Sequence, residues 1–146
     1  MNIIFLDFNG VLDTYDNIDE INIDNLKRLK NIVDVTESKV VISSSLKNSY
    51  YYTGHYSTFL KKIIKEIENI EIEVIGITPK AKTREEEIKL YLQLHPEVSN
   101  YCILDDDYEM ESIKEHLVKL PLQGEGSQGL NDVHMNKAIK ILKRIK

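Results

Sequence analysis

Short apolar runs alternate along this chain with segments of helical periodicity. The apolar runs are typical of strands buried on both faces, with the last of them the weakest, and they lie at 3–6, 40–42, 72–77, 101–104 and 117–120. Apolar residues recur at helix spacing over 26–33, 59–67, 88–94 and 133–145. This alternation predicts an α/β fold, a three-layer Rossmann-like parallel sheet with helices on both faces.

Length and composition predict one domain over residues 1–146. The chain is 42% hydrophobic and 29% charged, and it has no repeat, low-complexity tract or Pro/Gly/Ser-rich linker. A chain of this length can bury a core without disulfides or a structural metal. The formal charge of -5 argues against broad coating of nucleic acid, but it allows a local basic site that grips one phosphate.

Cysteine use and hydropathy favour a cytoplasmic protein. Cys102 is the only cysteine, so no internal disulfide can form. No apolar run approaches the ~20 residues that span a bilayer, and no basic segment precedes the first apolar run. We therefore expect neither export nor a membrane partner.

Polar side chains follow three of the predicted strands. Asp7 and Asn9 come after the first strand, a run of serines at 43–45 after the second, and a run of aspartates at 105–107 after the fourth. Such residues are also common turn formers at strand ends. Because ligands of parallel sheets bind at the carboxyl ends of the strands, we expect these groups to converge. Clustered carboxylates repel one another, and Mg²⁺ is the natural ion to neutralise them.

These segments resemble the motifs of the haloacid dehalogenase (HAD) superfamily of aspartate-nucleophile phosphohydrolases. IIFLDFNGVLDT is similar to its first motif, VVISSSLK to its second and YCILDDD to its fourth. The stretch REEEIKLYLQLHPEVSNYCILDDD and the late QGL resemble the small capless branch associated with RNA-repair and polynucleotide phosphatase proteins. The resemblance implies a Mg²⁺-dependent phosphohydrolase or phosphotransferase that acts on a phosphomonoester through an aspartyl-phosphate.

The resemblance also assigns the nucleophile and the metal ligands. Asp7 is the expected nucleophile and a metal ligand. The main-chain carbonyl of Asn9 is expected to ligate Mg²⁺, a role independent of its side chain. Asp105 and Asp106 are expected to hold the ion directly or through water.

Phosphate contacts are expected from the second motif. Ser43 matches the hydroxyl that binds the transferring phosphoryl group, and Ser44 is the alternative one residue later. Lys47 is a candidate for a second phosphate or substrate contact. The competing interpretation of Lys47 is a solvated surface lysine.

The third motif brings a basic residue from the start of a helix. Arg84 fits best and Lys82 is the alternative. A cation at a helix N-terminus adds to the positive end of the helix dipole, where phosphates bind. Arg84 could instead be a solvated charge that pairs with Glu86 or Glu87.

Asn9 departs from the family pattern, which has an acid/base aspartate there. An amide does not titrate near neutral pH, and general acid/base catalysis contributes about 10²–10⁴-fold. Asn9 therefore predicts slow turnover, an easily released leaving group, or a catalytically inactive phosphate-binding or regulatory module. Asp13, His55 or a tyrosine could supply the missing acid.

The gaps between the motifs leave no room for a cap domain. The first gap is predicted to hold one helix, and the second a loop, a helix and a strand. An open site suits a large phosphorylated substrate such as a nucleic-acid end. Four tyrosines, which could stack on bases or pack locally, follow the second motif at Tyr50, Tyr51, Tyr52 and Tyr56.

Overall fold

The computed structural model of the chain describes residues 1–106, 110–122, 124 and 126–144. These residues contain one sheet of five parallel strands in the order β3-β2-β1-β4-β5. The strands are β1 (Asn2–Leu6), β2 (Ser38–Ile42), β3 (Val74–Ile77), β4 (Asn100–Asp105) and β5 (Leu117–Lys119). All five predicted strands are thus confirmed. Asp107 and Ile145, which were included in the predicted acidic run and the last helix, lie outside the described residues.

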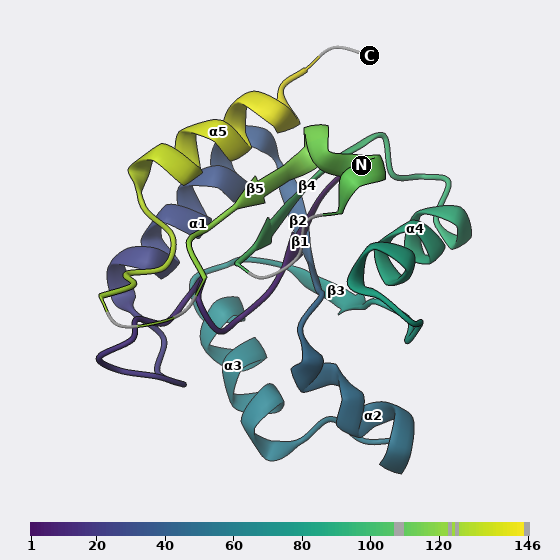
Figure 1. The fold of residues 1–146 in the computed structure, drawn as a ribbon, viewed down its shortest axis with the longest axis horizontal. Helices are drawn as coiled ribbons and strands as arrows, with labels where there is room; N and C mark the ends of the chain where they lie inside the picture. Colours follow the sequence, from purple (N-terminus) through teal and green to yellow (C-terminus); the bar gives the residue numbers. More distant parts are fainter. Residues whose placement is uncertain (107–109, 123, 125, 145–146) are drawn as a thin grey trace.

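Helices cover both faces of the sheet, which confirms the predicted three-layer α/β fold (Figure 1). The helices are α1 (Ile23–Thr36), α2 (Asn48–Thr53), α3 (Thr58–Glu68), α4 (Arg84–Leu94) and α5 (Asp132–Leu142), with 3-10 turns η1 (Ser45–Lys47) and η2 (Glu111–His116). Among these described helices, none combines the length and the apolar character that crossing a bilayer requires.

Alternation along β1 divides the core between the two faces. Ile4 and Leu6 belong to the cluster that packs against α1, α3 and α5. Ile3 and Phe5 point to the other face and pack with Ile88 of α4. Successive side chains of a strand point to opposite faces, so a continuous apolar run marks a strand covered on both sides.

The four predicted helices begin earlier than the first apolar residue of each pattern. Each of them follows a polar N-cap whose side chain accepts a hydrogen bond from a backbone N–H of the first turn, and these caps are Asn22, Ser57, Thr83 and Asn131. Because N-caps and first turns are polar, hydrophobic spacing alone does not detect them.

Two expectations were wrong in detail. The run at 72–77 was expected to form a strand buried on both faces, but β3 lies at the sheet edge and Ile75 is 37% exposed. The segment after the second motif was expected to begin as a loop, but it contains η1 and α2. In the described part of the chain, β3 pairs only with β2, so one side of this strand has no strand beside it.

The strand order places the end of β1 beside the end of β4. β1 lies at the centre of the sheet, with β2 and β3 on one side and β4 and β5 on the other. Leu6 and Leu104 are register partners, so the residues that follow them emerge side by side. The chain builds outward from β1 to β3 and then crosses to the other side of β1 to form β4. Parallel α/β sheets bind ligands at the point where the strand order changes direction in this way. Among the described residues no cap domain covers this edge.

Candidate functional site

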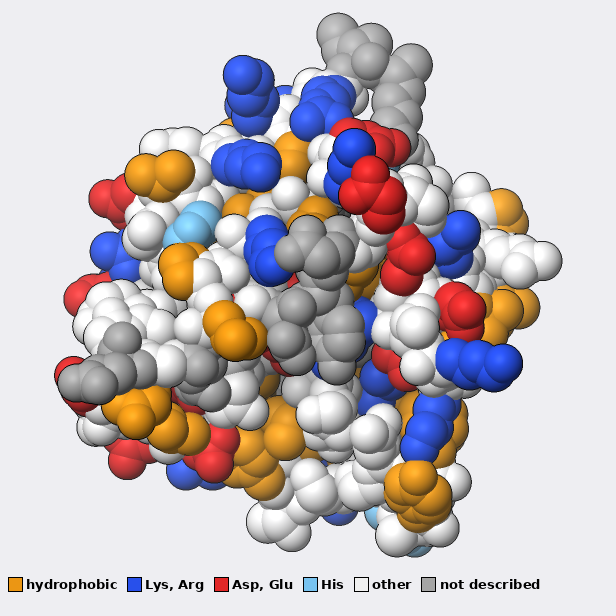
Figure 2. Space-filling view, viewed as in Figure 1, with side chains coloured by type: hydrophobic (Ala, Val, Ile, Leu, Met, Phe, Trp, Pro, Cys, Tyr) orange, Lys and Arg blue, Asp and Glu red, His pale blue; other side chains and the backbone are white. Residues whose placement is uncertain are grey.

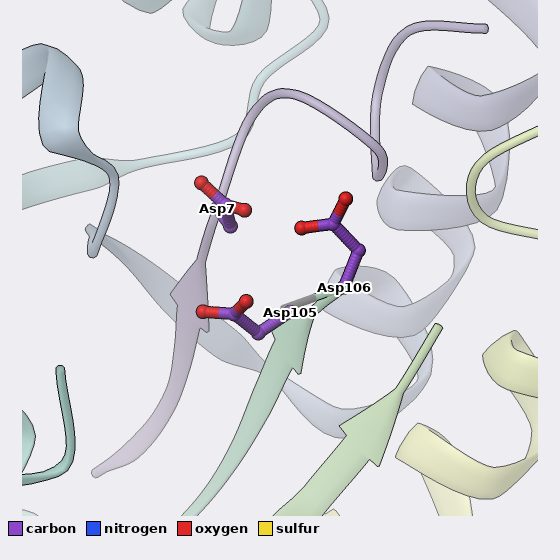
Figure 3. Close-up of side chains that lie close together, drawn as sticks. All are labelled: Asp7, Asp105 and Asp106. Carbon is purple, nitrogen blue, oxygen red and sulfur yellow. The ribbon is translucent and has the colours of Figure 1, made fainter. Parts of the chain in front are cut away.

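Three carboxylates converge at the ends of β1 and β4. The backbone N–H of Asp7 donates to the carbonyl of Leu104 at 3.1 Å, which continues the sheet pairing beyond β1. Asp105 ends β4 and Asp106 follows it. One carboxylate oxygen from each of Asp7, Asp105 and Asp106 lies within 4.8 Å of the other two, and the three side chains point toward a common space (Figure 3).

Burial makes this acidic cluster costly. Asp7 is 7% exposed, Asp105 is 0% and Asp106 is 5%. Burial, followed by the charge of Asp105, raises the pKa of Asp7 to about 8, although Arg84 opposes the shift. Three hard oxygen donors in this arrangement fit a divalent cation such as Mg²⁺, which would favour the ionised carboxylates.

Arg84 contacts the acidic cluster from the start of α4. Thr83 caps this helix by accepting a hydrogen bond from the backbone N–H of Glu86. The Nη1 atom of Arg84 donates to Oδ2 of Asp105 at 2.6 Å and lies 3.7 Å from Oδ1 of Asp7. Arg84 is 9% exposed, so it is not the solvated helix charge of the alternative interpretation.

Gly10 lets the first loop approach Asp106 closely. It adopts a φ of +82°, in the left-handed region that glycine enters without steric cost. A Cβ atom at this position would overlap the carboxylate of Asp106. The loop after β1 therefore needs glycine here for both its backbone conformation and its packing.

The second motif contains a buried hydroxyl that has no partner in the described part of the chain. Ser43 is 1% exposed, and its Oγ is one of the buried polar atoms that lack a hydrogen-bond partner among the described residues. Ser44 Oγ, in contrast, accepts the backbone N–H of Leu46 at 3.2 Å as the cap of η1. A buried hydroxyl without a partner suits a site that receives an external acceptor such as a phosphate oxygen.

Lys47 and Lys82 differ sharply in environment. Lys47 is 1% exposed, so its interpretation as a solvated surface lysine is wrong. Its ammonium donates to Oε1 of Glu87 at 2.8 Å. Burial lowers the pKa of Lys47, and the hydrogen bond to Glu87 opposes that shift. Lys82 is exposed, but it lines the same cavity of about 210 Å³ as Lys47 and Arg84.

The side chain of Asn9 is held by two carboxylates. Its amide nitrogen donates to Oδ2 of Asp13 and to Oδ1 of Asp19, both at 2.8 Å. Asp13 is fully buried and also accepts the backbone N–H of Gly10 at 2.7 Å. Asp19 is exposed and has a φ of +67°. Asn9 is therefore anchored within the loop after β1.

The sequence patterns missed two residues next to this site. The sequence indicates Glu87 only as an ion-pair partner of a solvated Arg84, and it gives no signal for Asp19. One signal for Glu87 was available, because Ile88 and Tyr91 mark the buried stripe of α4 and helical spacing extends it back through Glu87 and Arg84. The contact of Asp19 with Asn9 depends on loop conformation, which carries no periodic signal.

Comparison with known proteins gives one family match. A family model described as the HAD domain in Swiss Army Knife RNA repair proteins matches residues 3–135 of the chain. No curated protein and no solved structure matches it. The matched region contains β1 from Ile3 onward, all of β4 and α4, and all the candidate site residues.

Proposed function

Because this chain belongs to the family of HAD domains in Swiss Army Knife RNA repair proteins, we propose that it hydrolyses a phosphomonoester through an aspartyl-phosphate on Asp7. The convergence of Asp7, Asp105 and Asp106 beside Arg84 is the observation that carries this proposal. A HAD-type phosphohydrolase needs a nucleophilic carboxylate, oxygen ligands for a cation and a basic group at one point.

Asp7 carries the covalent chemistry. One of its carboxylate oxygens attacks the phosphorus, the bond from phosphorus to the ester oxygen breaks, and the leaving oxygen takes a proton from solvent. Water then attacks the phosphorus of the acyl phosphate, which releases inorganic phosphate and a proton and restores the Asp7 carboxylate. The N–H of Phe8, which donates to Oδ1 of Asp7 at 2.9 Å, orients the nucleophile.

The residues around Asp7 stabilise the transferring group. Phosphoryl transfer spreads negative charge over three equatorial oxygens, so catalysis depends on positioned cations and donors. Arg84 supplies a fixed positive charge, Ser43 a hydroxyl donor and Lys47 a second cation. Ser44 and Lys82 are weaker candidates for substrate contacts because the first caps η1 and the second is exposed.

Mg²⁺ is the cofactor that this donor set suits. Asp7, Asp105 and Asp106 would hold the ion, with the main-chain carbonyl of Asn9 as a further ligand. When bound, it would neutralise charge on the carboxylates and on the phosphoryl oxygens. Ionisation of Asp7, which burial and its acidic neighbours oppose, would then be favourable at neutral pH.

Turnover is expected to be slow because Asn9 stands where the family has its acid. The Asn9 amide donates two hydrogen bonds, and it has no proton to give to a leaving alkoxide. The same observation favours a second candidate function, a catalytically weak or inactive module that binds phosphate. An inactive module would differ from the proposed enzyme because no acyl phosphate would form on its Asp7.

A nucleic-acid end is the substrate class that the surroundings favour. Tyr50 packs edge-to-face against Tyr51 and Tyr56, as the local-packing interpretation expected. Tyr52 is different: it is 76% exposed, and the Nζ of Lys80 lies 4.4 Å from its ring centroid. Figure 2 shows hydrophobic and basic side chains together over α2, and exposed rings beside cations can stack on unpaired bases.

The test of the reaction is phosphate release from p-nitrophenyl phosphate with Mg²⁺ or with EDTA. We expect release that requires Mg²⁺ and a hydroxylamine-labile phosphoprotein, and Asp7→Asn should lose both. Asp16→Asn, an exposed aspartate in the loop after β1, is the matched control and should behave as the wild type. Undiminished turnover in Asp7→Asn would exclude the mechanism.

The binding-module alternative and the substrate class have separate readouts. If neither the wild type nor Asn9→Asp hydrolyses an ester while both bind inorganic phosphate, the non-catalytic function replaces the proposed one. For the substrate, kcat/KM with phosphorylated oligonucleotides should exceed that with a mononucleotide. Tyr52→Ala should reduce the oligonucleotide value alone, and equal effects on both substrates would contradict a role in stacking.

A further inference from the structure

Glu87 is a buried carboxylate that joins two cations of the candidate site. Its Oε1 accepts the Lys47 ammonium at 2.8 Å and lies 3.9 Å from Nε of Arg84. Its Oε2 accepts the backbone N–H of Ala81 at 3.3 Å. One carboxylate therefore links η1, the loop before α4 and the first turn of α4.

Burying these three charged groups has a large desolvation cost, which a purely structural contact would not require. Glu87 is 7% exposed, Lys47 is 1% and Arg84 is 9%, so three charged groups are held out of water. Replacing such buried ion pairs by well-packed apolar side chains is often neutral or stabilising in proteins. A buried charge cluster beside a candidate site is thus weak evidence for stability and better evidence for a functional arrangement.

The two sides of the Arg84 guanidinium face different carboxylates. Nη1 donates to Asp105 at 2.6 Å, whereas Nε lies 3.9 Å from Oε1 of Glu87, an ion-pair distance. Carboxylates near two edges of a guanidinium favour one orientation electrostatically, because its donors have a fixed fork geometry. Glu87 thereby limits how far Arg84 can rotate around its contact with the acidic cluster.

The ammonium of Lys47 depends on Glu87 for its position more than the guanidinium of Arg84 does. Among the described residues, Glu87 is the only hydrogen-bond or ion-pair partner of its ammonium. Lys47 and Arg84 line the same cavity of about 210 Å³. Without the Glu87 carboxylate, Lys47 would be attracted toward the nearby acidic cluster that Arg84 already contacts, where it would compete with a metal ion for the same oxygens.

We propose that Glu87 is a positioning residue that holds Lys47 and Arg84 as a preoriented pair of cations for the phosphoryl group. This inference rests on the proposed function, because it assigns the pair to the same phosphate. Glu87 does not touch the substrate. It acts by fixing two donors before the substrate arrives, so that little reorganisation accompanies binding.

The experiment measures the inhibition constant of inorganic phosphate against p-nitrophenyl phosphate, together with kcat and KM. Glu87→Gln keeps the shape of the side chain and removes its charge. We expect the inhibition constant and KM to rise about tenfold, a change typical of coupled neighbours. Glu86→Gln, an exposed neighbour on the same helix, is the matched control and should leave both constants unchanged.

A double-mutant cycle distinguishes positioning from a general loss of structure. In a Lys47→Met background, Glu87→Gln should raise the phosphate inhibition constant by clearly less than about tenfold, because one of the two cations it orients is absent. Independent effects that multiply would overturn the inference. So would a Glu87→Gln variant that loses thermal stability but keeps the wild-type constant.

Two further outcomes keep the test decisive. If Glu87→Gln does not fold, Glu87→Asp retains the charge and withdraws it by one methylene group, and a wild-type inhibition constant in that variant would overturn the inference. A wild type that neither hydrolyses the ester nor binds phosphate would remove the proposed function and this inference with it. If the wild type hydrolyses the ester and binds phosphate, and the Glu87 variants have the same inhibition constant as the wild type, only the inference about Glu87 is removed.

Discussion

The raised pKa of Asp7 links the stability of the metal-free protein to pH. The pKa rises from 3.8 to about 8 on folding, so between these values the folded protein binds more protons than the unfolded chain. Stability from this group is therefore lost as the pH rises. At about 1.36 kcal/mol per pKa unit, the loss between about pH 5 and pH 8 is roughly 4 kcal/mol.

Asp7→Asn isolates this contribution because an amide cannot ionise. In EDTA, we expect the melting temperature of the wild type to fall relative to that of Asp7→Asn as the pH is raised. For a domain of about this size, 1 kcal/mol corresponds to roughly 2–4 °C, so the difference should change by about 8–16 °C. Comparing the two proteins at each pH cancels the titration of groups that do not interact with Asp7.

Mg²⁺ should reverse the effect in the wild type alone. Near pH 8, an ion that binds only the folded form at 100 times its Kd stabilises by about 2.7 kcal/mol. Asp7→Asn lacks one ligand and should gain much less. Parallel pH curves for the two proteins in EDTA would refute the raised pKa of Asp7. Equal stabilisation of both proteins by Mg²⁺ would refute the metal site.

Two substitutions test how the backbone supports the site. Gly10→Ala should abolish stabilisation by Mg²⁺ because its methyl group overlaps the Asp106 carboxylate. Gly54→Ala is the control and should keep this stabilisation, because position 54 has a similar φ of +77° but open space around it. Melts of both variants with and without Mg²⁺ measure this, and equal responses would contradict it. Thr83→Ala removes the N-cap of α4 and should cost about 1 kcal/mol in thermal or urea unfolding, and an unchanged midpoint would show that the cap is dispensable.

Periodic burial made the fold predictable. A strand covered by helices on both faces has no solvent-facing position, so 3–6 and 101–104 appear in the sequence as unbroken apolar runs. The carboxyl ends of such strands meet at one edge, which is why Asp7 and Asp105 could be expected to converge. The edge position of β3 was not inferred, although Glu73 interrupts the run at 72–77 and no charged residue interrupts the runs of the central strands.

Residues whose roles depend on tertiary contacts were harder to predict. Lys47 is sequentially close to Ser43, but its burial depends on Glu87, which lies 40 residues later in the chain. A lysine is usually exposed, so its type alone favoured the wrong environment. The contact of Arg84 with Asp105 likewise depends on the position of the helix start relative to β4.

The geometry around Asn9 changes what an acid at that position would do. Asn9→Asp would face the carboxylates of Asp13 and Asp19 in place of the two hydrogen bonds that Asn9 now donates. Losing two hydrogen bonds to charged groups, each worth about 1.5–3 kcal/mol, should lower stability near neutral pH. The new carboxyl should also have a raised pKa because its neighbours are acidic, which suits a proton donor.

Exchanging the two side chains separates these effects. Asn9→Asp combined with Asp19→Asn moves the carboxylate to position 9 and keeps one pair of an amide and a carboxylate between positions 9 and 19. Asparagine tolerates the φ of +67° at position 19. We expect the exchanged variant to melt above Asn9→Asp alone and to hydrolyse alkyl phosphates at least about tenfold faster than the wild type, with a smaller gain on aryl phosphates. Asp19→Asn alone is the control and should show no gain. An exchanged variant that binds phosphate but hydrolyses alkyl esters no faster than the wild type would show that the missing acid is not what limits turnover.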